Sequence, residues 1–454
     1  MTVNATWNTT TATTLTGEEV IAMDQQYVMR AWSKQGQAAM AVEKAEGIYF
    51  WDYEGNRQVD MSSLLVNANI GHQHPKVVKA IQDQAAKMCF MAPSYATDVK
   101  SLLAKKLVEL AGGDMARVFL TNAGADANEN AIKMARIATG RTKVFSGYHS
   151  YHGATLAASN ASGDSRRFAA EIGGANGFVK FSNPSPYRDN LPFETEEALT
   201  AFYLKKLGEQ IQYEGPYNVA AILLETVIGA NGIIAYPKGY LEGVRNLCNS
   251  YGIVMICDEV MAGFYRTGTA FAFQQYAFTP DMITFAKGVT SGYVPLGGVI
   301  VSEWISEYFT ENQLQCGLTY SGHTLACAAG LATLEVYEDE NIAANVEKIG
   351  AILKDYLEEM KAKHPCVGDV RTYGLFCGVE LVLDKETREP LVPFNTPNRI
   401  MPAIYKELKD RGFSTFGRET TISVCPPLTI SEAELAEVMP ILDEVLTLID
   451  EQYM

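Results

Sequence analysis

Residues 219–225 read VAAILLE, residues 253–258 read IVMICD, and residues 282–287 read MITFAK. Each stretch is an apolar run of strand length without polar alternation, which is typical of a strand buried on both faces. A pattern of helical period over residues 241–248 separates the first two runs. Buried strands joined by helices predict a parallel sheet with right-handed crossovers, which is a doubly wound α/β fold.

The same alternation extends in both directions along the chain. Residues 118–120 form a short apolar run, and a glycine turn and a helical pattern over residues 127–138 follow it. Residues 298–301 form another strand-like run. We expect all of these strands in one parallel sheet.

Outside this centre, the pattern divides the chain into further parts. Residues 1–17 are rich in Thr and Asn and predict a flexible N-terminal arm. Residues 18–70 include a hairpin pattern and predict the N-terminal segment of a small domain. Residues 71–330 form the predicted large domain, and residues 331–454, with helices around alternating strands, predict the rest of a small α+β domain.

Composition excludes several classes of protein. The chain has 454 residues, 47% of them hydrophobic, which is enough to bury a large core. Its net charge of −16 disfavours binding to nucleic acid and to anionic membranes. No run approaches the ~20 apolar residues of a membrane span, and the N-terminus has no basic and apolar leader pattern. We therefore expect a cytoplasmic protein without nucleic-acid or membrane partners.

Cysteine and histidine spacing does not indicate a metal site. The eight cysteines form no C-x-x-C pair and are expected to be reduced and largely buried. His72 and His74 are close in sequence, but no acidic or cysteine partner lies at ligand spacing. We expect no bound metal.

Ionisable residues follow three of the predicted strands directly. Glu225, Asp258 and Lys287 each stand at or just beyond the end of an apolar run. Because the carboxyl ends of parallel strands meet at one edge of a sheet, we expect these side chains to lie close together and to form a site.

The chemistry of these groups suggests one cofactor. A lysine in an apolar pocket is a nucleophile toward carbonyl carbon, and a buried acid needs a cationic partner such as a protonated ring nitrogen. The turn TNAGAD at residues 121–126 would present free N–H groups to a phosphate. Pyridoxal 5′-phosphate (PLP) carries an aldehyde, a ring nitrogen and a phosphate. A dinucleotide would require G-x-G-x-x-G, which this turn lacks.

The motifs also resemble those of a known family. FLTNAGADANE at residues 119–129, YHG at 151–153, DEV at 258–260, TFAKG at 284–288 and TYSGH at 319–323 are similar to the ordered landmarks of class III aminotransferases, which have fold type I. The resemblance extends from about residue 47 to residue 428.

This resemblance implies catalytic roles for three residues. Lys287 would bind the cofactor aldehyde covalently and then move the proton between the substrate carbon and the cofactor. Asp258 would keep the ring nitrogen protonated. Tyr151 would stack on one face of the ring, and Val260 would pack against the other.

The resemblance to class III aminotransferases implies further cofactor contacts, some of them across subunits. Backbone groups of Gly124 and Ala125 would bind the phosphate together with Thr319 of a neighbouring subunit, so that the active form would be a homodimer or a tetramer of such dimers. Glu225 would belong to the same site. The turn has Ala123 and Ala125 where relatives commonly have hydroxyl residues, so N–H contacts would have to suffice there.

For the substrate, the sequence TFGR at residues 415–418 is similar to the corresponding region of taurine and β-alanine aminotransferases. The resemblance implies that Arg418 binds the anionic group of each substrate, and Glu225 is a plausible counter-charge for an arginine there. Ornithine-type members have an arginine at the position of Ser423. Trp32 could be either a core aromatic or a substrate-binding residue.

Several reactions stay open at this point. The subgroup resemblance favours transamination of an ω-amino acid, with taurine as donor (giving sulfoacetaldehyde) and 2-oxoglutarate as acceptor (giving glutamate). Transamination of taurine or β-alanine with pyruvate is an alternative. An isomerase, a decarboxylase or a non-catalytic homologue on the same fold is a further one, because fold alone does not determine the reaction.

Overall fold

The computed structural model describes residues 15–37, 39–171, 174–189, 193 and 195–454. Most of the predicted arm, residues 1–14, lies outside these described residues. The prediction that the arm extends to residue 17 is wrong at its end, because helix α1 (Gly17–Tyr27) begins there. Thr16 and Glu19 form a capping box that accounts for this start, each side chain accepting a backbone N–H of the other residue.

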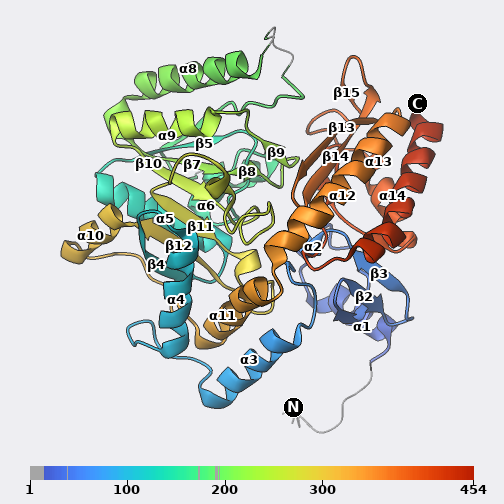
Figure 1. The fold of residues 1–454 in the computed structure, drawn as a ribbon, viewed down its shortest axis with the longest axis horizontal. Helices are drawn as coiled ribbons and strands as arrows, with labels where there is room; N and C mark the ends of the chain where they lie inside the picture. The colour runs from blue at the N-terminus through green and yellow to red at the C-terminus, as the bar shows by residue number, and fades with distance from the viewer. Residues whose placement is uncertain (1–14, 38, 172–173, 190–192, 194) are drawn as a thin grey trace, which may run out of the picture.

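A seven-stranded sheet forms the centre of the molecule (Figure 1). Its strands lie in the order β4-β12-β11-β10-β7-β5-β6. Their bounds are β4 (Met115–Thr121), β5 (Lys143–Gly147), β6 (Phe178–Phe181), β7 (Val219–Glu225), β10 (Val254–Asp258), β11 (Met282–Phe285) and β12 (Gly297–Ser302). The predicted α/β fold with a mostly parallel sheet is confirmed.

One strand does not follow the prediction. Strand β12 was expected to be parallel, but it runs antiparallel to both of its neighbours, β11 and β4. A parallel neighbour requires a crossover of a dozen or more residues, usually a helix. The chain between Phe285 and Gly297 contains only the short 3-10 turn η4 (Lys287–Val289), so it reverses direction instead.

Helices cover both faces of this sheet. Successive residues of β10 belong to different cores: Val254 and Ile256 pack with α5 (Gly124–Thr139), whereas Met255 and Cys257 face the opposite side. The remaining helices of this region are α3 (Pro75–Lys87), α4 (Asp98–Ala111), α6 (Leu156–Ala161), α7 (Phe168–Glu171), α8 (Glu196–Glu214), α9 (Tyr240–Tyr251), α10 (Glu303–Glu311) and α11 (Thr324–Asp339). Helix α9 ends at Gly252 in the left-handed conformation, as its sequence predicts.

The N-terminal and C-terminal parts of the chain form two smaller sheets. The first has the order β1-β2-β3-β16, so the N-terminal hairpin is extended by a strand close to the C-terminus. The second has the order β13-β14-β18-β17 with β15 beside β14. The bounds are β1 (Val42–Glu46), β2 (Tyr49–Asp52), β3 (Arg57–Asp60), β13 (Val367–Tyr373), β14 (Phe376–Asp384), β15 (Glu389–Pro390), β16 (Phe413–Ser414), β17 (Gly417–Arg418) and β18 (Thr421–Val424).

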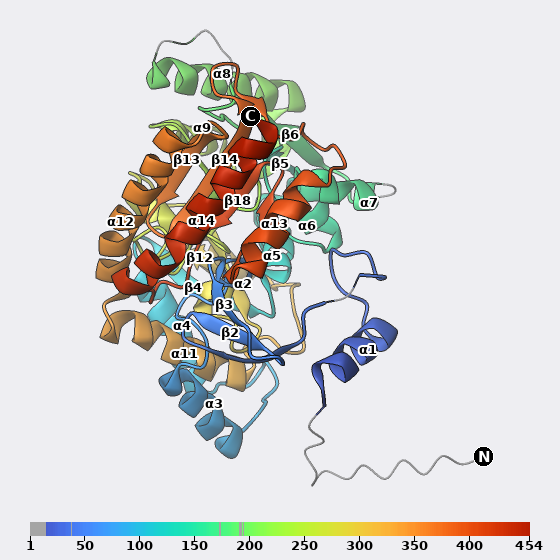
Figure 2. The ribbon, with the colours of Figure 1, turned by 90° about the vertical axis from the view of Figure 1, so that its right-hand side faces the viewer.

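Three long helices pack around the second small sheet (Figure 2). They are α12 (Ile342–Lys363), α13 (Ile400–Asp410) and α14 (Glu432–Tyr453). Short elements complete the chain: α2 (Ser63–Val66), β8 (Val227–Ile228), β9 (Ile234–Ala235), η1 (Ser165–Arg167), η2 (Pro216–Asn218) and η3 (Ala272–Gln275). The predicted domain boundaries near residues 70 and 330 stay a prediction.

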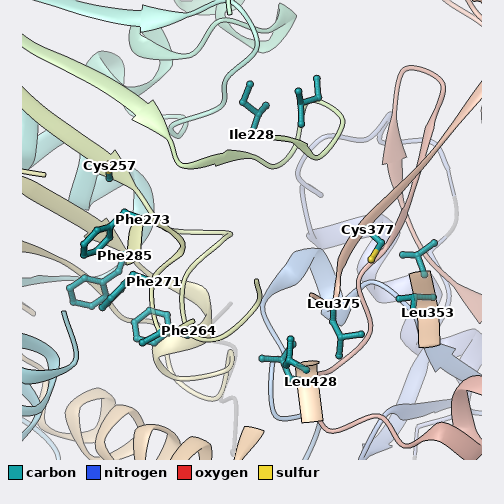
Figure 3. Packing of buried hydrophobic residues seen from close by; sticks show 14 of the residues in the cluster. Ile228, Cys257, Phe264, Phe271, Phe273, Phe285, Leu353, Leu375, Cys377 and Leu428 are labelled. Atoms are coloured by element: carbon teal, nitrogen blue, oxygen red, sulfur yellow. The ribbon is translucent and has the colours of Figure 1, made fainter. Parts of the chain in front are cut away.

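The hydrophobic core is continuous between the large and small sheets. Phe264, Phe271 and Phe285 lie on the side of the large sheet, and Leu353 and Leu375 on the side of the small one, all in the same cluster (Figure 3). Within the described parts of the chain, no helix is long and apolar enough to span a membrane.

Candidate active site

The three strand-end residues lie around one cavity. Asp258 is directly opposite Glu225 of β7 and Thr284 of β11 in the sheet register. Lys287 follows β11 by two residues. The cavity has a volume of about 400 Å³, and its lining includes Gly124, Ala125, Tyr151, Glu225, Asp258, Val260 and Lys287. The structure therefore brings together seven of the residues that the sequence singles out.

Asp258 is held in one orientation by neighbours from three elements. Its Oδ2 accepts hydrogen bonds from Asn128 Nδ2 at 2.8 Å and lies 2.7 Å from His152 Nδ1. Its Oδ1 accepts from the backbone N–H of Val260 at 3.0 Å. Asn128 is oriented in turn by Thr284, whose hydroxyl donates to its Oδ1 at 2.7 Å. These contacts fix the carboxylate in place.

Lys287 occupies an environment that favours a neutral amine. Burial lowers the pKa of Lys287 to about 8, although the carboxylates of Asp258 and Glu225 act in the opposite direction. The residue also has a φ of +48°, in the left-handed region that a side chain rarely adopts. Strained backbone of this kind concentrates at functional sites, where the surrounding structure holds it.

Glu225 is bound to backbone rather than to an arginine. It accepts the N–H of Tyr151 at 2.9 Å and the N–H of Gly229 at 2.8 Å. Burial raises the pKa of Glu225 to about 7. Among the described residues, no arginine forms an ion pair with Glu225, and its role as the counter-charge of an arginine stays a prediction.

The turn before α5 can accept an anion through its backbone. Ala123 is the N-cap residue, and no side chain caps the helix, so the first N–H groups of α5 stay available beside the cavity. The turn packs very closely against its neighbours. A Cβ on Gly124 would lie 2.9 Å from both methyl carbons of Val260, and a Cβ on Gly153 would lie 2.5 Å from the Cβ of Ala125.

Arg166 and Asp164 stand beside Tyr151, and the sequence analysis did not single them out. The guanidinium carbon of Arg166 lies 3.5 Å from the centre of the Tyr151 ring. Its Nε donates to both oxygens of Asp164, at 3.1 and 3.0 Å. No sequence motif marks these residues; they follow the YHG motif by about a dozen positions on a connection whose course only the structure shows.

Arg418, from the small sheet, lies beside Asp164 and Ser165. It lies on β17, and its Nη2 donates to Ser165 Oγ at 2.9 Å and lies 3.7 Å from Asp164 Oδ1. Its Nε is buried and has no hydrogen-bond partner among the described residues. Arg418 and Ser165 also line a second cavity of about 600 Å³. The predicted anion-binding residue thus has unused donors close to Tyr151.

Three predicted residues are not part of the lining of this cavity: Arg418, Trp32 and Thr319. Trp32 is 69% exposed and is not part of the lining. Thr319 is also exposed and does not line the cavity of its own chain. Within the described residues, no group of three or more His, Cys, Asp or Glu side chains could hold a metal ion.

Comparisons with known proteins agree with this geometry. Taurine:2-oxoglutarate aminotransferase from Bifidobacterium kashiwanohense, solved in complex with PLP and glutamate, is 59% identical, with a TM-score of 0.95 and coverage of 97% of this chain and 99% of that one. An (S)-enantioselective omega-transaminase from Thermomicrobium roseum is 34% identical, with a TM-score of 0.90 over 96% of this chain and 99% of that one. Taurine–pyruvate aminotransferase from Bilophila wadsworthia is 31% identical over 96% of this chain and 98% of the relative.

The family model of class-III aminotransferases matches residues 31–446, which include every residue around the cavity. Together with relatives of this identity and coverage, the match shows that the chain belongs to the class-III aminotransferases and is a PLP-dependent aminotransferase.

Proposed function

We propose that this enzyme transfers the amino group of taurine to 2-oxoglutarate and produces sulfoacetaldehyde and glutamate. The observation that carries the proposal is the pair of guanidinium groups, Arg166 and Arg418, gathered around Asp164 beside Tyr151. Sulfonates and carboxylates are recognised by planar guanidinium donors. The 59% identical protein of Bifidobacterium kashiwanohense carries the same activity in its name, and this supports the proposal.

The residues around the cavity fit PLP. The uncapped N-terminus of α5 suits the phosphate, Asp258 suits a protonated ring nitrogen, and Gly124, having no side chain, lets the turn pack directly against Val260. When bound, PLP supplies an aldehyde that receives the amino group and a ring that stabilises negative charge. Backbone N–H groups of Gly124 and Ala125 would hold the phosphate.

Each predicted catalytic residue would then have one task. The Lys287 amine would take the proton from the substrate carbon that bears the amino group and deliver it to the cofactor, which requires a neutral amine. Asp258 keeps a proton on the ring nitrogen, and Asn128 and His152 hold the carboxylate in position. Tyr151 stacks on one face of the ring, so that the reacting bond keeps its alignment.

Pyruvate is the second candidate acceptor, because a relative at 31% identity is a taurine–pyruvate aminotransferase. The two acceptors differ in charge. 2-Oxoglutarate has two carboxylates and can engage both Arg166 and Arg418, whereas pyruvate has one. We therefore expect kcat/KM with taurine to be at least about tenfold higher for 2-oxoglutarate, corresponding to a single charged contact.

A keto-acid panel with taurine as donor tests this assignment. A preference for pyruvate would refute the acceptor, and the absence of sulfoacetaldehyde with every acid would refute the donor. Taurine without any keto acid should convert each active site once and stop with the amino group on the cofactor. Continued turnover under those conditions would indicate an isomerase or a decarboxylase instead.

We also propose that the active form is a homodimer or a tetramer of dimers in which Thr319 binds the phosphate of the neighbouring subunit. Thr319 is exposed and lies beside Tyr320, which is 55% exposed and stacks edge-on with Phe90. Mixing Lys287→Ala protein with Thr319→Arg protein should restore activity in hybrid dimers. A fully active monomer in sedimentation would refute the proposal. Trp32 as a substrate residue and a cytoplasmic location stay predictions.

A further inference from the structure

Asp164 lies between Arg166, which stacks on Tyr151 of the cavity lining, and Arg418. Its side chain is 1% exposed, and it belongs to none of the sequence motifs. It contacts Arg166 through the backbone N–H, at 2.9 Å, and through the guanidinium group. Arg418 approaches the same carboxylate from the other side of the fold, with Nη2 at 3.7 Å from Oδ1. A third neighbour, Asn231, donates to Oδ2 at 3.4 Å.

Arg166 and Arg418 contact Asp164 in different ways. Arg166 gives its Nε edge to the carboxylate, so its remaining N–H groups are free to face another anion while its plane stays against Tyr151. Arg418 touches Asp164 only at long range, and its buried Nε has no hydrogen-bond partner among the described residues, with the carboxylate of Glu419 at 3.9 Å. Asp164 therefore orients one guanidinium firmly and leaves the other incompletely satisfied.

The charges explain why the arrangement suits anionic substrates. Arg418 lies 3.7 Å from the carboxylate of Asp164 and 3.9 Å from that of Glu419, both beyond hydrogen-bond distance, so its guanidinium group stays available to an anionic substrate. Burial alone would raise the pKa of Asp164, but hydrogen bonds and charge from Arg166 and Arg418 lower it below the ordinary value, so the carboxylate is ionised. Without it, two guanidinium groups would face each other at close range and repel.

We propose that Asp164 is a positioning residue that determines specificity: it holds the guanidinium groups of Arg166 and Arg418 as a pair beside Tyr151 and thereby selects substrates with an anionic tail. The proposal rests on the proposed function, since it assigns the tail-binding group of that site. Asp164 acts through the two arginines and does not contact the reacting atoms.

The test compares anionic and neutral amino donors. We measure kcat and KM of the holoenzyme for taurine, for glutamate and for propylamine, whose tail carries no charge. In Asp164→Asn, which keeps the size of the side chain, we expect the ratio of kcat/KM for taurine to that for propylamine to fall about tenfold or more, mainly through KM. Asp164→Glu restores the charge and should recover part of the ratio.

A matched control separates positioning from general damage. Asp281 is also a partly buried aspartate that binds an arginine, with Arg245 Nη1 at 2.7 Å, but it stands at the opposite end of β11 from the cavity. Asp281→Asn should leave the ratio unchanged even where it lowers stability. The double variant Asp164→Asn/Arg166→Met should lose less than the two single losses combined, because Asp164 acts in part through Arg166.

Each result decides the proposal. An unchanged ratio in Asp164→Asn, a ratio that rises, or equal losses for taurine and propylamine would overturn it. A failure of the proposed function has a different result. In that case the wild-type enzyme would not accept taurine, but the effect of Asp164→Asn could still be measured by comparing glutamate with propylamine.

Discussion

Replacing Asp258 by asparagine tests the centre of the site, because the structure determines what an amide would meet there. Asn128 cannot reorient, since its Oδ1 accepts from Thr284 and its Nδ2 also donates to the carbonyl of His152 at 2.8 Å. Its Nδ2 therefore faces Oδ2 of Asp258 permanently. The backbone N–H of Val260 faces the other oxygen in the same way.

An amide at position 258 must therefore place its NH₂ against a donor in either orientation. Turned one way, it meets the amide of Asn128; turned the other way, it meets the N–H of Val260. One buried donor then loses its acceptor, which costs about 1–3 kcal/mol in the free energy of unfolding. If Asp258 faces the ring nitrogen as proposed, the loss of its charge should slow proton transfer at the substrate carbon by roughly 10²–10³-fold, the effect of removing one preorganised electrostatic contact.

The two effects are measured separately. Denaturant unfolding gives the loss of stability, and single-turnover absorbance changes of the holoenzyme with taurine or glutamate give the rate. The control is Asp281→Asn, whose side chain also accepts three hydrogen bonds, from Arg245, from the N–H of Met255 and from Trp304. It should lose stability and keep its single-turnover rate. If Asp258→Asn stays within about threefold of the wild-type rate, the reasoning about the ring nitrogen is wrong.

Four further predictions concern other residues of the site. Lys287→Ala should fold but lose the adduct that borohydride traps and nearly all transamination; normal turnover would exclude Lys287 as the catalytic amine. Because burial lowers the pKa of Lys287 to about 8, capture of PLP by the cofactor-free protein should accelerate with pH as the neutral amine forms and level off above about pH 8; a rise that continues to pH 10 would contradict the lowered pKa. Gly124→Ala should push the methyl groups of Val260 into the ring site and weaken PLP binding about tenfold or more, measured by equilibrium dialysis, with Gly36→Ala, which has open space around it, as the control. Arg418→Lys should raise KM for taurine and for 2-oxoglutarate by about tenfold or more, and unchanged constants for both would place the anion site elsewhere.

The sequence by itself determines the sheet and much of the site. Unbroken apolar runs identify β7, β10 and β11, because a strand buried on both faces cannot carry polar alternation. Once those strands are parallel neighbours, the residues that end them must share an edge. Glu225, Asp258 and Lys287 therefore follow from local pattern alone.

Contacts between distant segments are decided by the tertiary structure. The antiparallel direction of β12 depends on the short connection that precedes it, and the apolar run of β12 fits either direction. Asn128 contacts Asp258 only because α5 packs across the ends of β10 and β11. Arg418 and Ser165 are 253 positions apart and meet through the packing of the small sheet against the connection after α6. An arginine or an aspartate in a turn has the same local sequence pattern whether it faces solvent or a buried counter-charge. Only the packed structure therefore shows that Asp164 contacts both Arg166 and Arg418.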